Sequence, residues 1–479
     1  MEKTLKNIPF IFKIGYGTGN LGSGLIFQSM NTYLVFYATA VLNLPGVLVG
    51  IAVSLSIIID GISDPVMGYI SDRTYMKTLG RRHLYLLIGT FFTALINYFL
   101  WIIDPALPLA VKFIWLFIAV ILVKLLLTVF STPYVALGAE LSSDYNERTS
   151  IQAVRTVFFI LGVLFASGLS LYLFFNPTAE YPLGQLNPAA YRNLGLASST
   201  LMLVFGLTCF FATFKFIPQL YKIEQKNSIS SQANIVHRTS RIIKDFSTAI
   251  ENYDYRCLVL GYLFTNLTVA LFTAIGLHVF TYTFNMNNNE IAIIIGLQFL
   301  FSIFSQPVWV EISRKIDKRP SVILGIALSI LSGLYFLLAV FYRDYIVQHY
   351  LLLLPYSLLA GFGTGGLFSL PGSMVADIID VEELKTGLRL EGIYYGCFTF
   401  AYKTSQSVAI LLLGLLLDII SFDATSEVQP EAIRFILGFT LALGGIFFML
   451  LAWYFYRHYR LDSQVINKIQ AKIRQDKDL

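Results

Sequence analysis

The chain has 479 residues, of which 56% are hydrophobic and only 13% are charged, and its mean hydropathy is +0.68. Soluble domains carry about 25% charged residues, so the composition excludes an ordinary soluble protein and predicts an integral membrane protein. The net charge of +5 comes from basic clusters between apolar segments, which does not indicate nucleic acid as a partner. The three cysteines lie singly and suggest neither a metal site nor a disulfide framework.

Apolar segments recur along the whole chain, and each is long enough to cross a membrane, which takes ~20 mostly apolar residues. The polar stretch 222–255 is expected to be a cytoplasmic linker with a short amphipathic helix in its second half. We therefore predict an all-α membrane protein with six-helix halves at 1–221 and 256–458, and a cytoplasmic tail at 459–479. The twelve expected spans are 13–41, 46–71, 82–103, 108–136, 150–176, 192–220, 256–284, 289–312, 320–342, 348–376, 389–420 and 432–456.

The loops between the spans differ in charge from one side of the membrane to the other. The loops after the second and eighth spans and the C-terminal tail are rich in Lys and Arg, whereas "TAVLNLPG" on the opposite side has none. The positive-inside rule then predicts that both termini are cytoplasmic, in a multi-pass protein of the cell membrane. The N-terminal segment leads directly into a long span without a cleavage signature, so we expect no removed signal peptide.

Two short sequences of the first half return in the second half. "SDPVMGYIS" at 63–71 matches "SQPVWVEIS" at 305–313, and "FSTP" at 130–133 matches "FSLP" at 368–371. Their offsets, 242 and 238, are nearly equal, and each match falls on the equivalent span of the other half. The halves are therefore predicted to be parallel repeats of six helices.

The second span carries acids where apolar residues are expected, in "DGISDPVMGYISD" at 60–72. Asp60 and Asp64 are one helical turn apart and share a face. A charge at the bilayer centre costs at least ~2.5–3.5 kcal/mol, so such residues need partners. Lys124, Arg155 and Lys403 are candidates in other spans, and simple pairing that joins helices is one interpretation. Repulsion between the two carboxylates, which favours a bound proton or cation, supports a coupling-ion site instead.

Several motifs resemble the glycoside-pentoside-hexuronide:cation symporters, the melibiose permease family of the major facilitator superfamily. They are "DGISDPVMGYISDRTYMKTLGRRH", "YGTGNLG", "STPYVALGAEL…NERTSIQAVR" and "DIIDVEELKTGLRLEGIYYGCFTFAYK", which cover both halves in the expected order. The resemblance implies the major facilitator fold, with a substrate site near the midplane between the halves. It also implies sodium- or proton-coupled symport of a sugar, glycoside or related solute by alternating access, and it extends to animal lysolipid symporters.

The resemblance assigns roles to individual residues. The family's cation site corresponds to Asp60, Ser63, Asp64 and Thr128. Lys403 corresponds to the helix-11 lysine near the ion and substrate sites, and it could neutralise a carboxylate when the cation is absent, although a structural salt bridge is the alternative. Arg155 corresponds to the helix-5 arginine of the sugar pocket, or else it pairs with an acid on the cytoplasmic side.

The sequence departs from the family at the sugar pocket. The aspartates that hold sugar hydroxyls in melibiose permeases are replaced by Gly24 and Ser131, and a tryptophan is replaced by Val135. The galactoside-type pocket is therefore absent, which leaves a lysolipid or other amphiphile as the alternative substrate. Possible polar contacts nearby are Gln28, Asn31, Tyr134 and Tyr394, for each of which ordinary helix packing is the competing role.

Lys124 is a second departure, one turn before Thr128 on the same face of its helix. Its ammonium could reach the carboxylate pair, compete with Na+ and favour coupling to a proton. Alternatively, it extends toward the outer surface and touches neither acid. The coupling ion is therefore left open between H+ and Na+.

Charged residues next to the spans resemble the superfamily's cytoplasmic gate. Pairs between them would be worth roughly 0–1 kcal/mol each when solvated, but a network formed in one state would bias the conformational equilibrium. The gate candidates are Asp72, Arg73, Arg81 and Arg82 after the second span, Asp144, Glu147 and Arg148 after the fourth, and Asp377, Asp380, Glu382 and Glu383 after the tenth.

Other functional classes fit the sequence less well. An intramembrane enzyme would need a nucleophile–base or metal constellation, and none of the five histidines lies near another in sequence or near the acid pair. A non-transporting membrane sensor would not need two ion-site carboxylates beside a pocket. We expect a monomer in the lipid bilayer that binds a small-molecule substrate and a coupling cation, with no cofactor and no structural metal.

Overall fold

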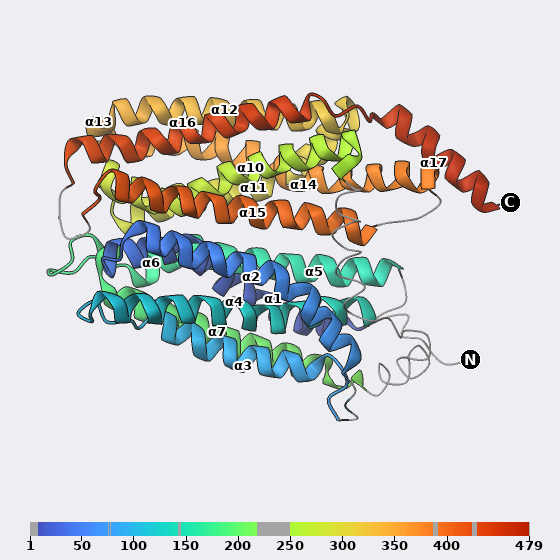
Figure 1. The fold of residues 1–479 in the computed structure, drawn as a ribbon, viewed down its shortest axis with the longest axis horizontal. Coiled ribbons are helices and arrows are strands. Elements are labelled where there is room, and N and C mark those ends of the chain that lie inside the picture. The colour runs from blue at the N-terminus through green and yellow to red at the C-terminus, as the bar shows by residue number, and fades with distance from the viewer. Residues whose placement is uncertain are drawn as a thin grey trace. The chain divides into compact units, whose positions relative to one another are not determined.

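The computed structural model describes residues 8–74, 76, 78–141, 145–217, 250–386, 391–423 and 429–478, and these residues form an almost entirely helical protein. The predicted linker helix lies outside the described residues. Figure 1 shows the helices running lengthwise within each of two compact units. Their bounds are α1 Phe10–Phe36, α2 Gly46–Arg73, α3 His83–Leu100, α4 Leu109–Glu140, α5 Tyr145–Leu164, α6 Ser170–Phe174, α7 Pro188–Phe214, α10 Tyr253–His278, α11 Asn288–Ile316, α12 Lys318–Phe341, α13 Arg343–Gln348, α14 Leu354–Thr386, α15 Glu391–Ile419, α16 Glu431–Tyr456 and α17 Ser463–Asp478.

The observed helices follow the expected spans in order. Among the described residues, eleven helices are long and apolar enough to cross a membrane. The first expected span corresponds to α1, a 27-residue helix whose polar stretch "KIGYGTGN" lowers its hydropathy. Its length is sufficient to span a bilayer.

The two units follow the two halves of the sequence with two exchanges. Unit 1 takes the described residues of Met1–Ser231 together with Asn287–Ala292 and Leu411–Glu427, and unit 2 takes the rest. The exchanged segments are the start of α11 and the end of α15. Asp418 on α15 accepts hydrogen bonds from the backbone nitrogens of Gly46 (2.7 Å) and Val47 (3.0 Å), and thereby caps α2.

The first helices of the two halves end in the same way. α1 continues into a π-helical turn at Tyr37–Val41, and α10 continues into one at Val279–Thr283. Each turn is followed by an asparagine in the left-handed conformation, Asn43 (φ 53°) and Asn285 (φ 48°). Asparagine tolerates this conformation better than most residues. The separation of 242 residues equals that of the first sequence match, which supports the repeat at the level of the backbone.

Helix packing also repeats between the units. In unit 1, α1 packs on α7, and α3 packs on both α4 and α7. In unit 2, the equivalent helices make the same pairs, because α10 packs on α16, and α12 packs on both α14 and α16. The sequence prediction of parallel repeats therefore agrees with the packing within each unit.

One predicted helix end is misplaced, and one helix was missed. α14 runs to Thr386, ten residues beyond the predicted end of the tenth span, so Asp377 and Asp380 lie inside a helix and not after it. Charged residues end an apolar span, but they do not end a helix, since Asp and Glu side chains are tolerated in a solvated helix. The tail contains the helix α17, which was not predicted.

Gly162 allows α5 to approach α1 closely. A Cβ at this position would lie 2.5 Å from the carbonyl oxygen of Leu21 and 2.9 Å from the backbone nitrogen of Leu25, whereas a Cβ at Gly296 would meet nothing within 4 Å. We predict that Gly162→Ala destabilises the protein by about 1–3 kcal/mol through overpacking. Gly296→Ala is the matched control and should leave stability unchanged or slightly raised. Thermal unfolding in detergent measures both, and equal melting temperatures would contradict the close approach.

Candidate functional site

The two intramembrane acids of α2 meet one threonine of α4. The Thr128 hydroxyl lies 2.8 Å from Oδ1 of Asp60 and 3.1 Å from Oδ1 of Asp64. The Ser63 hydroxyl lies 3.3 Å from Oγ1 of Thr128 and 3.0 Å from the backbone oxygen of Asp60. The structure therefore brings together four residues that the sequence had grouped as a cation site.

The hydroxyl of Thr128 has one proton for its two carboxylate contacts. A threonine hydroxyl has one proton to donate, yet Thr128 contacts a carboxylate oxygen of both Asp60 and Asp64. One contact is satisfied by the hydroxyl proton. The other becomes favourable when a proton sits on one carboxyl group or when a cation lies between the oxygens.

Lys124 is buried on α4, one turn before Thr128. Only 5% of the residue is exposed, and its ammonium lies 5.2 Å from the centroid of the Phe27 ring, within range of a cation–π interaction. This burial contradicts the alternative in which Lys124 extends to the outer surface. A charged group held inside a helix bundle affects any cation that binds nearby.

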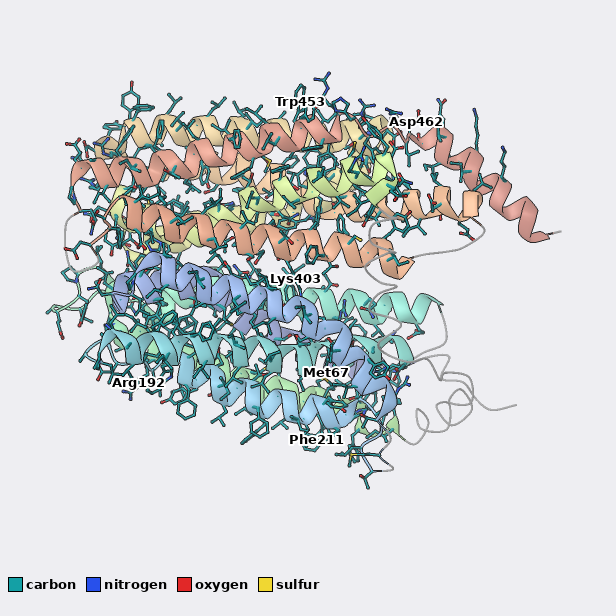
Figure 2. The ribbon with its side chains drawn as sticks, viewed as in Figure 1. Met67, Arg192, Phe211, Lys403, Trp453 and Asp462 are labelled. Atoms are coloured by element: carbon teal, nitrogen blue, oxygen red, sulfur yellow. The ribbon has the colours of Figure 1, made fainter. Side chains whose placement is uncertain are left out.

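Lys403 lies on α15 in unit 2 and is labelled in Figure 2. It is half-buried there. Its expected proximity to the acids of unit 1 stays a prediction.

Most candidate substrate residues of unit 1 are engaged in packing. Tyr134 is fully buried, stacks on Tyr16 with 4.6 Å between ring centroids, and exchanges hydrogen bonds of 3.0 Å with it, since each hydroxyl donates to the other's backbone oxygen. Gln28 is buried and donates to Thr32. A Cβ at Gly24 would lie 2.8 Å from the Phe159 ring and 3.0 Å from the backbone oxygen of Phe159, so this glycine packs closely against α5.

Arg155 has unused hydrogen-bonding capacity. Its Nε and Nη1 atoms are buried and have no hydrogen-bond partner within the described residues. The guanidinium lies near the Tyr16 hydroxyl, and the backbone oxygen of Arg155 accepts from Asn20 at 3.1 Å. Buried donors without partners are rare in folded proteins, which makes this side chain suited to a polar ligand.

The remaining two candidates lie elsewhere. Ser131 is half-buried on α4, one turn after Thr128 on the chain. Tyr394 is buried in unit 2, where its backbone oxygen accepts from the Tyr255 hydroxyl and its ring packs edge-on against the Tyr255 ring. Neither position tests a role in substrate binding.

Charged residues at one end of unit 1 form a compact network. Glu140 accepts from Arg81 (2.6 Å) and from Nε and Nη2 of Arg82 (3.1 and 2.7 Å). Arg82 also donates to Ser71 at 2.6 Å, and only 5% of this arginine is exposed. The loop after α2 is thus tied to the end of α4.

Unit 2 holds a similar pair at the corresponding place. Lys318 at the start of α12 contacts both carboxylate oxygens of Asp377 on α14, at 2.7 and 2.6 Å. The side chains of Asp72, Arg73 and Arg148, and Asp144 as a whole, lie outside the described residues. Asp380 lies on α14, one turn after Asp377.

Three charged residues of these contacts were not identified as gate residues from the sequence: Glu140, Lys318 and Lys13. Glu140 stands at the end of an apolar span, where a single acid gives no distinctive signal, and Lys13 of α1 pairs with Glu147 of α5 at 2.7 Å. The signal available for Glu140 is the repeat, because the acid Asp377 occupies a similar place in the second half.

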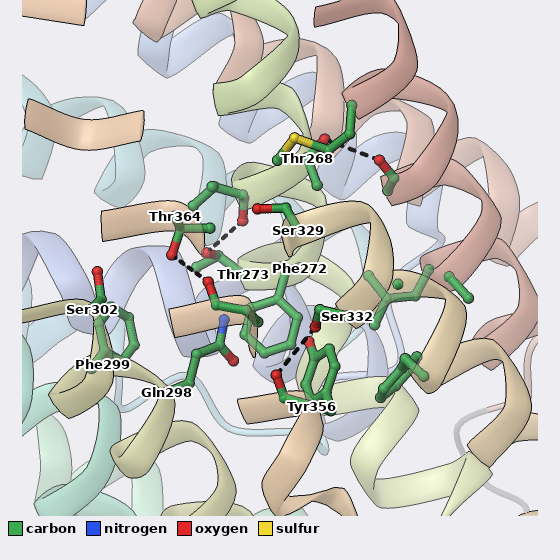
Figure 3. A pocket seen from close by; sticks show the side chains of 18 of the residues that line it. Thr268, Phe272, Thr273, Gln298, Phe299, Ser302, Ser329, Ser332, Tyr356 and Thr364 are labelled. Carbon is green, nitrogen blue, oxygen red and sulfur yellow. Dashed lines mark hydrogen bonds between the residues drawn. The ribbon is translucent and has the colours of Figure 1, made fainter. Parts of the chain in front are cut away.

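Unit 2 also contains a partly open cavity of about 100 Å³ (Figure 3). Figure 3 shows hydroxyl groups around it from Thr268, Ser332 and Thr364, with the rings of Phe272 and Tyr356. The three hydroxyls donate to backbone oxygens, so they present acceptor oxygens to the cavity. The volume suits a few atoms and not a whole sugar.

The sequence profile of the family described as MFS/sugar transport protein matches residues 15–463. The chain belongs to this family. The resemblance to the glycoside-pentoside-hexuronide:cation symporters of the major facilitator superfamily is thereby confirmed, and with it a membrane transporter that is not an enzyme.

Individual relatives agree with the family. The chain is 23% identical to the mouse protein named sodium-dependent lysophosphatidylcholine symporter 1, over 96% of this chain and 88% of that one. It is 22% identical to the isoprimeverose transporter of Lactiplantibacillus pentosus, over 98% and 94%. The solved structure of a D-xylose-proton symporter is similar with a TM-score of 0.64 at 14% identity, covering 95% of this chain and all of that one. This last likeness shows the major facilitator fold.

The network at Glu140 gives a matched pair of variants in this family member. We predict that Arg82→Gln costs about 1–3 kcal/mol of stability, because it removes charged hydrogen bonds from a side chain that is 6% exposed. Arg81→Gln should cost less than about 1 kcal/mol, because this side chain is 21% exposed and solvent replaces its bond. Thermal unfolding of the two purified variants measures the difference, and the reverse order would refute the geometry.

Proposed function

We propose that the chain transports a sugar, a glycoside or a related small organic solute together with a cation by alternating access. The observation that carries this proposal is the contact of Asp60 and Asp64 with the single hydroxyl of Thr128. One bound positive charge would stabilise the two carboxylates inside the apolar bundle. The binding of a cation would therefore be coupled to the arrangement of α2 and α4. Membership in the symporter family supports the same reading.

Both H+ and Na+ suit the chemistry of this cluster. Carboxylate, hydroxyl and backbone oxygens are hard ligands of the kind Na+ binds, and a single carboxylate suffices for a proton. The ammonium of Lys124, buried on the same helix as Thr128, would compete with Na+ for the carboxylate oxygens. A proton bonds covalently to one carboxylate oxygen and needs no further ligands, so this competition affects it less. We therefore favour H+ as the coupling ion.

Two basic residues receive roles in this proposal. The buried, unpartnered nitrogens of Arg155 would bind a hydroxyl or an anionic group of the substrate. Lys403 would neutralise an acid of the cation site when the cation leaves, as the family resemblance implies. Substrate contacts from Gln28, Ser131, Tyr134 and Tyr394 would be secondary.

The charged networks would act as the cytoplasmic gate. The Glu140 network of unit 1 and the Lys318–Asp377 pair of unit 2 lie at equivalent positions of the repeats. Contacts present in only one transport state bias the equilibrium between states. The gate would lie on the cytoplasmic side, with both termini, in a monomer within the cell membrane.

A lysolipid is the second candidate substrate, and a specific observation favours it. Gly24, which replaces a sugar-binding aspartate of melibiose permeases, packs closely against Phe159 of α5, so no acidic side chain stands there to hold sugar hydroxyls. The mouse relative is named a lysophosphatidylcholine symporter. Arg155 would then bind the phosphate of the headgroup.

We predict that Asp60→Asn, Asp64→Asn and Thr128→Val each lower coupled uptake at least about ten-fold, because each removes a ligand of the cation. Counterflow into proteoliposomes measures this with a panel of sugars and lysolipids, with and without Na+ and a pH gradient. Matched controls are Asp104→Asn, an exposed loop acid, and Thr208→Val, an exposed threonine of α7 that bonds only within its helix. Uptake unchanged in the site variants, or transport of neither substrate class, would contradict the proposal.

Lys124 provides a separate test of the coupling ion. We predict that Lys124→Met makes uptake respond more strongly to Na+, because the variant loses the buried charge that opposes a second cation. The measurement is initial uptake at fixed pH over a series of Na+ concentrations. An unchanged Na+ response would show that Lys124 does not influence the cation site.

A further inference from the structure

A groove runs along the outside of unit 2 where α12 begins and α16 gives way to α17. Its volume is about 740 Å³. Figure 2 marks this corner of the unit by Trp453 near the end of α16 and Asp462 just before α17. Its lining combines two arginines, Arg319 and Arg460, with an apolar wall of Ile316, Pro320, Ile323, Leu324, Ala327 and Leu461.

The two guanidinium groups are available for an anion. Arg319 donates from Nη2 to the backbone oxygen of Arg457 at 2.6 Å, and the guanidinium of Arg460 lies 4.2 Å from the centroid of the Tyr253 ring. Within the described residues, neither guanidinium forms an ion pair with a carboxylate. An arginine without a carboxylate partner is suited to a phosphate group.

The groove also contains two acids, and both are used to cap helices. Asp317 accepts from the backbone nitrogens of Lys318 (2.6 Å) and Ser463 (2.7 Å), and Asp462 accepts from that of Val465 at 2.8 Å. The partial positive charges at the starts of α12 and α17 therefore offset the two carboxylates. The carboxylates are thus engaged in helix caps, and the two arginine side chains are left without a carboxylate partner among the described residues.

The groove crosses the expected edge of the membrane. Membrane-spanning segments end at Ile316 and Tyr456 and begin at Lys318, so the arginines lie at the water-facing margin of three spans. Leu324 and Ala327 lie about two turns inside α12, and both are exposed. The basic groups at the membrane margin would suit the phosphate of a phospholipid headgroup. The exposed apolar side chains further along α12 would suit its acyl chain.

We propose that this groove binds an anionic phospholipid of the cytoplasmic leaflet, with its headgroup phosphate on Arg319 and Arg460 and an acyl chain along Leu324 and Ala327. The basic loops assign this end of the unit to the cytoplasmic side by the positive-inside rule. That leaflet carries anionic lipids that attract juxtamembrane arginines. The apolar wall favours a lipid over a free phosphate compound.

The test measures lipid binding to the purified full-length protein by native mass spectrometry. Phosphatidylglycerol is compared with phosphatidylcholine that carries the same acyl chains. Each arginine near a membrane surface contributes about five-fold to the affinity for anionic lipid, so Arg319→Gln with Arg460→Gln should weaken phosphatidylglycerol binding about 25-fold. Phosphatidylcholine binding should change little. Ala327→Trp, which fills the groove and leaves both arginines, should also weaken phosphatidylglycerol binding.

A matched control removes the same charge outside the groove. Arg314→Gln with Lys315→Gln alters exposed residues at the end of α11, both of which lie 3.6 Å from Glu311, and should change phosphatidylglycerol affinity no more than about two-fold. Equal losses in control and groove variants would overturn the proposal, as would equal binding of the two lipids by the unaltered protein. Displacement of the lipid by glycerol phosphate at equal concentration would overturn the acyl-chain contact. If Arg319→Gln lowers the melting temperature, Arg460→Gln and Ala327→Trp carry the test.

Discussion

Two carboxylates one turn apart inside an apolar helix are the constraint on which the functional account depends. A single charge at the bilayer centre is costly, and a second of the same sign beside it adds repulsion. Asp60 and Asp64 offset these costs through Ser63 and Thr128, which bring hydroxyl groups from two helices to the same place. Both carboxylates contact the single hydroxyl proton of Thr128, an arrangement that a bound proton or cation would stabilise.

The rest of unit 1 holds this site in position. Close packing of α1 on α5 at Gly162 and the mutual hydrogen bonds of Tyr16 and Tyr134 fix the helices around it. Glu140 at the end of α4 binds Arg82, which lies just before α3, and Asp377 in the last third of α14 binds Lys318 at the start of α12. The fold thus separates an apolar interior with few charges from a water-facing end with many.

Much of this could be predicted from the sequence, because a membrane imposes strong patterns. Span lengths follow from the bilayer thickness. The helical period placed Asp60 and Asp64 on one face, and the family resemblance added Ser63 and Thr128 to the same site. The helix bounds agree with the expected spans to within about six residues except at the end of α14, which continues as a solvated helix. The paired π-helical turns before Asn43 and Asn285 could not be predicted, since the two sequences share little apart from the asparagine.

Other features were beyond the sequence because they depend on three-dimensional neighbours. Glu140 is one acid among many until its distances to Arg81 and Arg82 are known, and Arg319 looks like part of an ordinary basic loop until the groove beside it is seen. The burial of Lys124 likewise follows from packing, since a lysine in a span can extend to the surface or stay inside.

The central claim is that the pair Asp60–Asp64 holds one proton or one Na+ at a time. Infrared difference spectroscopy of the purified protein measures it most directly, through the carbonyl band of a protonated carboxyl group. The account predicts such a band near neutral pH in the absence of Na+, its loss in Asp60→Asn or Asp64→Asn, and its persistence in Asp104→Asn. Two fully ionised carboxylates near neutral pH, with a spectrum insensitive to Na+, would contradict it.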